Sequence, residues 1–425
     1  MRWIKYVNRG TNLHIFCIAT LIFGCHSSRI KSHYVKAEEI QYRFSKQQTL
    51  KNYSPDYISY IPATQNIEHT SSRTIRVNFH FINGSDSSLN YLGEDATRFA
   101  YKLIEEANEN LKTNKRMRLP PGNQTICLAP MYQYQITITK GLEAYQGVYC
   151  HFDDTLGYFI NRGPNRNNFD RSVINKYVIG QDSILNIFII PHHPDSISSP
   201  TYPVTASGIA LGGSVKISGV FETGNPPWAF KGLLNHEIGH VIGLTHTWAS
   251  NDGCDDTPKN PNCWNISDEG PCDIWASNNL MDYNAAQNAL TPCQIGKIHQ
   301  SMANERSLIR KFLVRDWCDL DQTKTIRIRD TCDWAGAKDL SGHLIVSRHA
   351  QLAVRNRISF PEGGKLIVEP GGILILEDGA RLHNACHAEW EGIEIQKERN
   401  LQGEVILTGP AQIENCRNKV TFLKG

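Results

Sequence analysis

The sequence lacks a strong charge of either sign and lacks long apolar runs. Its 425 residues include 44 Lys and Arg against 42 Asp and Glu, which gives a formal net charge of +2. Such a balance provides no basic surface for nucleic acid or for an anionic membrane. Beyond the N-terminal region there is no apolar window of 18 residues, so no transmembrane helix is expected. Nucleic acid is therefore excluded as a partner, and membrane contact is confined to the N-terminus.

The N-terminus has the layout of a secretory signal. Basic residues precede an apolar stretch at 15–23, which is far shorter than the roughly 20 residues that a spanning helix needs. The stretch ends in Leu-Ile-Phe-Gly-Cys, which resembles the lipobox of bacterial lipoproteins and implies that Cys25 is lipidated once residues 1–24 are removed. Ordinary cleavage next to an unmodified cysteine is the alternative. An exported protein is expected in both cases, held at the outer membrane or cell surface if the lipid is present.

Cysteine is absent from residues 26–126, and ten cysteines follow. An even number in an exported chain favours disulfides. Four of them lie close together in the sequence: Cys254, Cys263, Cys272 and Cys293. None of the four shows the Cys-x-x-Cys spacing of a zinc cluster, so disulfides that staple a long loop are expected. The connectivity stays open, and Cys254–Cys272 with Cys263–Cys293 is one of three pairings.

An α+β domain is expected over residues 73–320. It follows a polar segment at 25–72 that suggests a tether or a removable pro-segment. Residues 75–81 alternate apolar and polar like a half-buried strand, and residues 95–111 carry apolar side chains at helical spacing. A continuous apolar run within 184–191 is typical of a buried strand.

Three further segments belong to the same domain. Residues 132–139 predict a strand, and the Gly-rich segment 208–220 predicts a short strand with turns. Residues 228–242 have helical spacing, follow two prolines and are stopped by Gly243. The predicted helix at 228–242 carries the principal motif.

The pattern changes between residues 321 and 425. Short β-rich stretches occur at 344–346, 352–354, 366–368 and 373–376, with Gly-rich turns between them. Strands this brief cannot bury a face alone, and stacking them would supply the missing core. A β-solenoid is therefore expected, with a small β-sandwich as the alternative. No polar cap is visible at the end of the sequence, which suggests an incomplete module.

Residues 236–246 fit the pattern His-Glu-x-x-His-x-x-Gly-x-x-His. Histidines four apart lie one above the other on a helix, so His236 and His240 can bind one ion. A glycine at Gly243 lets the chain turn sharply and return His246 as a third ligand. The motif predicts one catalytic Zn²⁺ with a fourth position open to water.

Glu237 is adjacent to the first of these ligands and is not a ligand itself. Zinc lowers the pKa of a bound water to about 7, and a neighbouring carboxylate can take its proton as the water attacks an amide carbonyl. The sequence therefore predicts hydrolysis of peptide bonds with Glu237 as the general base.

This motif is the hallmark of the metzincins, in which a methionine forms a tight turn beneath the zinc. Met281, within Asn-Asn-Leu-Met-Asp-Tyr, matches that methionine. The resemblance also implies that Tyr283 lies near the zinc and stabilises the oxyanion. An ordinary core position is the alternative for each of these two residues.

The details resemble the pappalysin-like (cytophagalysin) metallopeptidases. The zinc motif continues as Thr-Trp at 247–248, followed by Cys-Asp-Asp-Thr-Pro at 254–258 and Thr-Pro-Cys-Gln at 291–294. The resemblance covers residues 73–315 and implies a mixed twisted sheet with an active-site helix. Cys293 stands where that family usually has glycine, so its disulfide partner is open.

The resemblance further matches Asp255, Asp256 and Thr257 to a region that binds structural calcium, with an exposed acidic loop as the alternative. Together these features predict an exported zinc endopeptidase that acts on proteins or peptides. A surface adhesin or glycan-binding protein that works through residues 321–425 is the alternative function.

Overall fold

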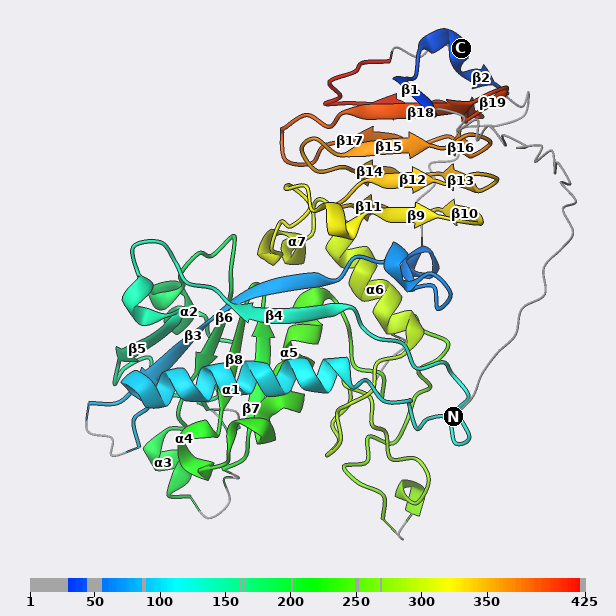
Figure 1. Ribbon diagram of the computed structural model, residues 1–425. Coiled ribbons are helices and arrows are strands. Elements are labelled where there is room, and N and C mark those ends of the chain that lie inside the picture. Colours follow the sequence, from blue (N-terminus) through cyan, green and yellow to red (C-terminus); the bar gives the residue numbers. More distant parts are fainter. Residues whose placement is uncertain are drawn as a thin grey trace, which may run out of the picture.

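The structure is a computed structural model. It describes residues 30–43, 56–85, 89–160, 162–163, 165–199, 202, 204–248, 252–267 and 270–420. The predicted signal peptide and Cys25 lie outside these ranges. No helix within the described ranges is both long enough and apolar enough to cross a membrane. Figure 1 shows an α/β domain with a stack of short strands next to it.

The α/β domain is built on one mixed sheet. Its strands are β3 (Arg73–Asn83), β4 (Tyr132–Ile136), β5 (Val148–Phe152), β6 (Leu185–Ile189), β7 (Ser207–Leu211) and β8 (Ser214–Ser218). The order is β4-β3-β6-β8-β7, and β5 pairs with the later half of β3. All pairs are parallel except β7 with β8. The strands predicted at 75–81, 132–139 and 184–191 are therefore present.

The segment 208–220 forms two strands, although one strand with turns was predicted. Strands β7 and β8 pair antiparallel across a Gly-Gly turn, in which Gly212 has φ 64°. Glycine adopts this positive φ readily, so the two glycines form the turn of the hairpin. The same glycines interrupt the apolar pattern of the sequence, which is why only one strand was predicted. The consequence is that β7 becomes an edge strand of the sheet.

Helices α1 and α5 pack together against the sheet. The α-helices of the described residues are α1 (Gly93–Lys112), α2 (Ser172–Tyr177), α3 (Pro194–Ile197), α4 (Val220–Thr223), α5 (Lys231–Ile242), α6 (Pro292–Ala303) and α7 (Leu308–Phe312). The apolar residues of α1 that predicted a helix at 95–111 are buried in the same core as β3, β6 and α5. The predicted helix 228–242 is a 3-10 turn, η5 (Pro227–Phe230), that continues into α5.

The C-terminal module (residues 321–420) consists of short strands in three sheets. They are β9 (Ile326–Ile328), β10 (Thr331–Trp334), β11 (Lys338–Asp339), β12 (Leu344–Val346), β13 (Gln351–Val354), β14 (Arg357–Ser359), β15 (Lys365–Val368), β16 (Ile373–Leu376), β17 (Arg381–His383), β18 (Gly392–Glu398), β19 (Leu401–Gln402), β20 (Glu404–Leu407) and β21 (Gln412–Ile413). The four β-rich stretches predicted from the sequence are β12, β13, β15 and β16.

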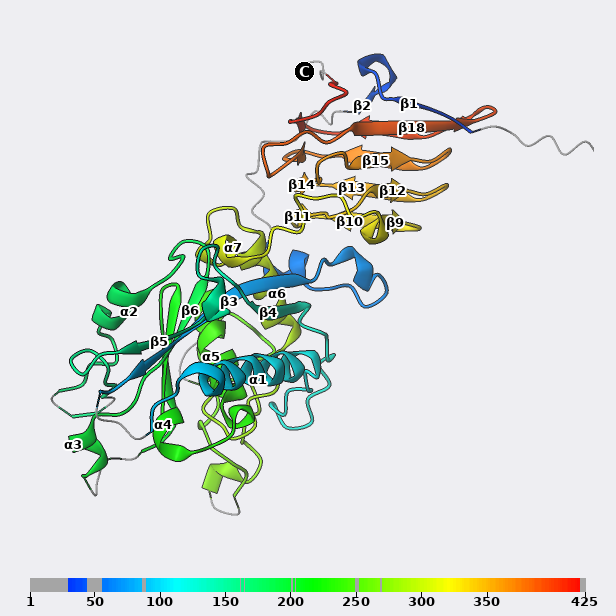
Figure 2. The same cartoon turned by 60° about the vertical axis from the view of Figure 1, so that its left-hand side comes forward.

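The three sheets of the module run side by side through successive layers. Their parallel orders are β9-β12-β15-β18, β10-β13-β16-β20 and β11-β14-β17-β21. Within the first sheet, the inward residues Leu344, Leu366 and Ile393 are in register and fully buried. Figures 1 and 2 show the short strands of successive layers stacked above one another. Each layer thus aligns its apolar side chains with those of the layer before, which supplies the core that one short strand lacks.

The segment predicted as a tether or pro-segment contains regular structure in its described parts. Strand β1 (Lys31–Tyr34) pairs antiparallel with β18, and β2 (Gln41–Tyr42) pairs parallel with β20. Further along, the 3-10 helix η2 (Tyr57–Tyr60) packs on α6 so closely that a Cβ on Gly296 would lie 2.5 Å from the carbonyl oxygen of Tyr57. The N-terminal segment therefore contacts both parts of the protein.

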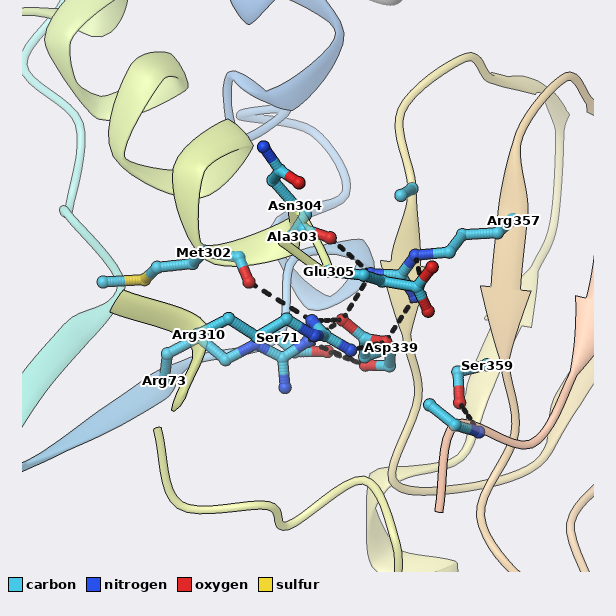
Figure 3. A network of polar contacts seen from close by, with 12 residues as sticks. Ser71, Arg73, Met302, Ala303, Asn304, Glu305, Arg310, Asp339, Arg357 and Ser359 are labelled. Carbon is cyan, nitrogen blue, oxygen red and sulfur yellow. Dashed lines mark hydrogen bonds and ion pairs between the residues drawn. The ribbon is translucent and has the colours of Figure 1, made fainter. Parts of the chain in front are cut away.

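The α/β domain and the module meet at a buried carboxylate, Asp339 on β11. Figure 3 shows guanidinium groups from both parts converging on it. Arg310 donates to its two oxygens at 2.7 and 2.9 Å, and Arg357 donates at 2.5 Å. Arg73 donates to its backbone carbonyl at 2.9 Å. Burial acts to raise the pKa of Asp339, but Arg357 and Arg310 hold that pKa far below its usual range.

We predict that Asp339→Ala destabilises the protein by about 3–5 kcal/mol, because it leaves buried guanidinium groups without their partner. Urea unfolding followed by tryptophan fluorescence measures the change. Asp333→Ala is the matched control: Asp333 pairs with Arg355 at 2.8 Å, but its side chain is 49% exposed. Asp333→Ala should lower the free energy of unfolding by no more than about 1 kcal/mol. Equal losses in the two variants would contradict a special role for the buried cluster.

Candidate metal centre

Helix α5 and the turn after it assemble the three motif histidines. The helix ends at Gly243, which has φ 113° and donates through its N–H to Gly239 O at 3.1 Å and to His240 O at 3.0 Å. This left-handed conformation, which favours glycine, reverses the chain and returns His246 toward the helix. The turn that the glycine spacing predicted is therefore present.

The ring nitrogens of the three histidines converge. Nε2 of His236 lies 3.2 Å from Nε2 of His240 and 3.2 Å from Nε2 of His246, and the third Nε2–Nε2 distance is 3.1 Å. Three nitrogens bound tetrahedrally to zinc at about 2.0–2.1 Å stand about 3.3 Å apart. The described residues thus offer a triangle of ligand atoms that could hold one metal ion.

Hydrogen bonds at the opposite ring nitrogens fix the tautomers of two of these histidines. Nδ1 of His236 lies 2.8 Å from the carbonyl oxygen of Leu280, and Nδ1 of His240 lies 2.9 Å from that of Leu244. Because a carbonyl oxygen only accepts, each Nδ1 carries the proton and each Nε2 presents a lone pair. Two lone pairs facing each other repel, and a cation between them removes the repulsion. The arrangement therefore fits a metal ion better than a hydrogen-bonded cluster.

Burial keeps these rings neutral, which is the form that binds a metal. It lowers the pKa of His236 to about 3 and that of His246 to about 4. The pKa of His240 is lowered for the same reason. Protonation of the rings therefore does not compete with a metal ion at neutral pH.

Glu237 is held between helix α5 and the edge strand β7. A Cβ on Gly208 would lie 2.6 Å from Cγ of Glu237 and 2.8 Å from its Oε1, so a larger residue here would displace the Glu237 side chain from this position. Burial raises the pKa of the carboxyl to about 8, and a hydrogen bond from the backbone of Ala210 acts in the opposite direction. A carboxylate with this raised proton affinity can act as a base near neutral pH. Gly208 was not identified from the sequence, because the motif contains no information about the opposite strand.

Met281 lies directly beneath helix α5 and is fully buried. A Cβ on Gly239 would lie 2.5 Å from its sulfur, so the glycine of the motif permits the close approach. Asn279 orders this turn: its Oδ1 accepts from Met281 N at 2.9 Å, and its side-chain amide donates to Gln294 at 2.8 Å. The same turn supplies the Leu280 carbonyl that fixes the His236 tautomer.

Tyr283 lies alongside the histidines. Its ring centroid is 4.8 Å from that of His246 and 5.7 Å from that of His236. The side chain is 46% exposed, so it is not an ordinary core tyrosine. Burial is the larger cause and the nearby Glu237 the smaller cause of a raised pKa of the Tyr283 hydroxyl. The hydroxyl therefore stays protonated and can donate a hydrogen bond.

Thr247 and Asp282, which directly follow the third motif histidine and Met281, connect two parts of the site, and the sequence did not reveal this role. The Thr247 hydroxyl lies 2.6 and 2.7 Å from the two carboxylate oxygens of Asp282, which is fully buried. Asn260 also donates to Asp282 at 3.1 Å. Trp248 stacks on His246 with ring centroids 5.7 Å apart. The hydrogen bonds between Thr247 and Asp282 thus connect the chain after the third histidine to the turn that carries Met281.

Disulfides staple the loop between the third histidine and helix α6, as predicted, and the structure selects one of the three pairings that the sequence left open. The bonds are Cys254–Cys293 and Cys263–Cys272, with Cα–Cα distances of 5.7 and 5.6 Å. The shorter loop is nested inside the longer one, and Cys293 is brought to Cys254 by the start of α6. All four sulfurs are thus used, which leaves none for a zinc cluster.

Further cysteines lie outside this loop. Cys318 and Cys386 form a third disulfide, which links the end of the α/β domain to the module. The described cysteines without a disulfide are Cys127, Cys150, Cys332 and Cys416.

Asp256 and Thr257 make hydrogen bonds within the stapled loop, and the calcium site that the resemblance implied at Asp255, Asp256 and Thr257 stays a prediction. The Thr257 hydroxyl lies 2.7 Å from a carboxylate oxygen of Asp252, and Asp256 accepts from the backbone N–H of Cys293 at 3.1 Å. The side chain of Asp255 is exposed. Thr257 and one carboxylate oxygen of Asp256 therefore help to order the stapled loop.

No family model and no curated protein matches the sequence. Solved structures of mirolysin align with part of this chain. Mirolysin in complex with compound 9 has a TM-score of 0.41 and 15% identity, covering 57% of this chain and 96% of that chain. Mature mirolysin of Tannerella forsythia in complex with a cleaved peptide has a TM-score of 0.41 and 16% identity, with the same coverage of both chains. A promirolysin mutant of that organism has a TM-score of 0.40 and 16% identity, and the match covers 57% of this chain and 84% of that chain. These values are too low to assign a family.

We predict that His240→Asn reduces bound zinc from about one ion per chain to almost none, because two ligands are too few for a tight site. Elemental analysis after dialysis against a weak chelator measures the content. His349→Asn is the control, since His349 is exposed and its φ of 63° is tolerated by asparagine. Retention of zinc by the His240 variant would rule out this centre.

Proposed function

We propose that this protein is an exported zinc-dependent endopeptidase of the metzincin type. The observation that carries the proposal is the convergence of the Nε2 atoms of His236, His240 and His246 beside a buried Glu237 of raised pKa. Three histidine ligands with an open fourth position are typical of catalytic zinc, whereas structural zinc sites have four protein ligands. The pappalysin-like branch, suggested by the sequence motifs, is part of the same proposal.

The residues of the chain divide the chemistry between them. Zinc held by the three histidines would supply a water of lowered pKa and polarise the scissile carbonyl. Glu237 takes a proton from the attacking water and passes it to the leaving nitrogen, for which its raised proton affinity suits it. The Tyr283 hydroxyl donates a hydrogen bond to the oxyanion that develops on the carbonyl oxygen.

The edge strand β7 supports a peptide as the substrate. It pairs with β8 on one side only and is half-buried along its length, within the part of the chain that the structure describes. An extended peptide can add to such an edge through backbone hydrogen bonds. Gly208 on β7 touches Glu237, so a peptide bound along this strand passes the general base.

Export and anchoring complete the proposal. Three disulfides in the described residues fit an oxidising compartment. We further propose that Cys25 carries a lipid and that residues 321–425 form a β-solenoid. That module packs on the α/β domain through Asp339, which favours a supporting role over an independent adhesin or glycan-binding function.

We predict that Glu237→Gln lowers the rate of casein or gelatin cleavage by about 10²–10⁴-fold without loss of zinc, because only the base is removed. Cleavage assays with and without a chelator, together with zinc analysis, measure both effects. Glu105→Gln, an exposed substitution on α1, should leave activity unchanged. Activity that survives both chelation and the Glu237 substitution would refute the proposal.

We predict that Tyr283→Phe lowers kcat by about 10²–10³-fold, because the ring remains and only the donor to the oxyanion is lost. KM and zinc content should change little. Steady-state kinetics on a fluorogenic peptide separate kcat from KM. Tyr145→Phe, at a comparably exposed tyrosine, serves as the control. An unchanged kcat would remove Tyr283 from the mechanism.

A further inference from the structure

The far end of the C-terminal module needs a cover. Among the described residues of the module, β18 and β20 are the final parallel strands of their two sheets, so each has an outer edge with backbone groups to satisfy. The apolar core reaches this layer, because Trp390, Ile393 and Leu407 are all buried there. An open edge next to an apolar core is a site for pairing with another chain.

Residues 30–43 occupy both edges. Strand β1 continues the sheet beyond β18, and the Val35 N–H donates to Ile393 O at 2.9 Å. Strand β2 continues the sheet beyond β20, and the Arg43 N–H donates to Leu407 O at 2.8 Å. The segment thus adds one strand to each of two sheets, as a further layer of the module would (Figure 1).

The same segment also closes the core. Val35 is 4% exposed and Ile40 is 5% exposed, and both belong to the apolar cluster of the module. The 3-10 turn η1 (Ala37–Glu39) crosses from one sheet to the other between them. Glu39 fixes this crossing by accepting from Lys36 N at 2.9 Å and lying 2.7 Å from the ring nitrogen of His33.

We propose that residues 30–43 are the terminal cap of the C-terminal module and are retained in the working protein. The occupant of the far end of the module is therefore the chain's own N-terminal segment. A pro-segment whose removal activates the enzyme would have to leave this cap behind, because its loss would expose two strand edges and the core between them. The inference does not depend on the metal centre.

The test uses the full chain with the double substitution Val35→Asp and Ile40→Asp. Burying two carboxylates in an apolar core is unfavourable, so the cap should detach. Hydrogen exchange followed by mass spectrometry should then show the amides of β18 and β20 exchanging at least about tenfold faster. Size-exclusion chromatography should show self-association through the freed edges. Ile30→Asp, at a position that is 57% exposed, is the matched control and should change neither measurement.

Two results would overturn the proposal. One is unchanged protection of β18 and β20 in the double variant. The other is that the mature protein from its natural source begins after residue 43 while its module keeps the same protection. If the double variant does not fold, Val35→Ala with Ile40→Ala should still give a smaller increase in exchange confined to the same strands. Zinc content should be unchanged in these variants, so the outcome is independent of the proposed catalysis.

Discussion

The hydrogen bond from His236 Nδ1 to the Leu280 carbonyl connects the elements on which the candidate site depends. It joins helix α5 to the turn that carries Met281, and it fixes the tautomer that exposes a lone pair on Nε2. The close contact of Gly239 with the Met281 sulfur sets the distance between the same two elements. Asp282 then holds the backbone after His246 to that turn through Thr247. His236 and the chain after His246 are thereby positioned by partners outside the candidate metal centre.

A second constraint holds the two parts of the chain together. Helix α6 carries Cys293 in its first turn, where the disulfide of that residue closes the stapled loop, and ends at Ala303, whose carbonyl accepts from Arg357 of the module at 2.5 Å. The same guanidinium binds Asp339, to which Arg310 of the α/β domain also donates. One helix therefore runs from the wall of the candidate site to the buried ion cluster, so the module and the site share a rigid element.

Local sequence was sufficient for much of this structure. The period of the apolar residues located α1, and the spacing of histidines and glycine located the end of α5 and the converging rings. Short apolar stretches predicted β12 and β16, because the buried side chains occupy alternate positions within each strand. These features depend on residues a few positions apart.

What the sequence did not reveal depends on distant partners. The contact of Gly208 with Glu237 requires β7 to lie over α5, which no local pattern indicates. The disulfide pairing depends on where α6 begins. The polar, unremarkable composition of residues 30–43 concealed two strands, because their pairing is determined by β18 and β20 at the other end of the sequence.

The placement of β1 and β2 has a consequence for the order of folding. Strands β1 and β2 are synthesised before the α/β domain, whereas their partners β18 and β20 are synthesised after it. Closing so long a loop is entropically costly and slow compared with local pairing. The α/β domain can bury its own core beforehand, whereas the layer that contains β18 and β20 stays uncovered until β1 and β2 pair with it. The long-range pairing of the N-terminal segment, rather than any local element, therefore determines when this layer is covered.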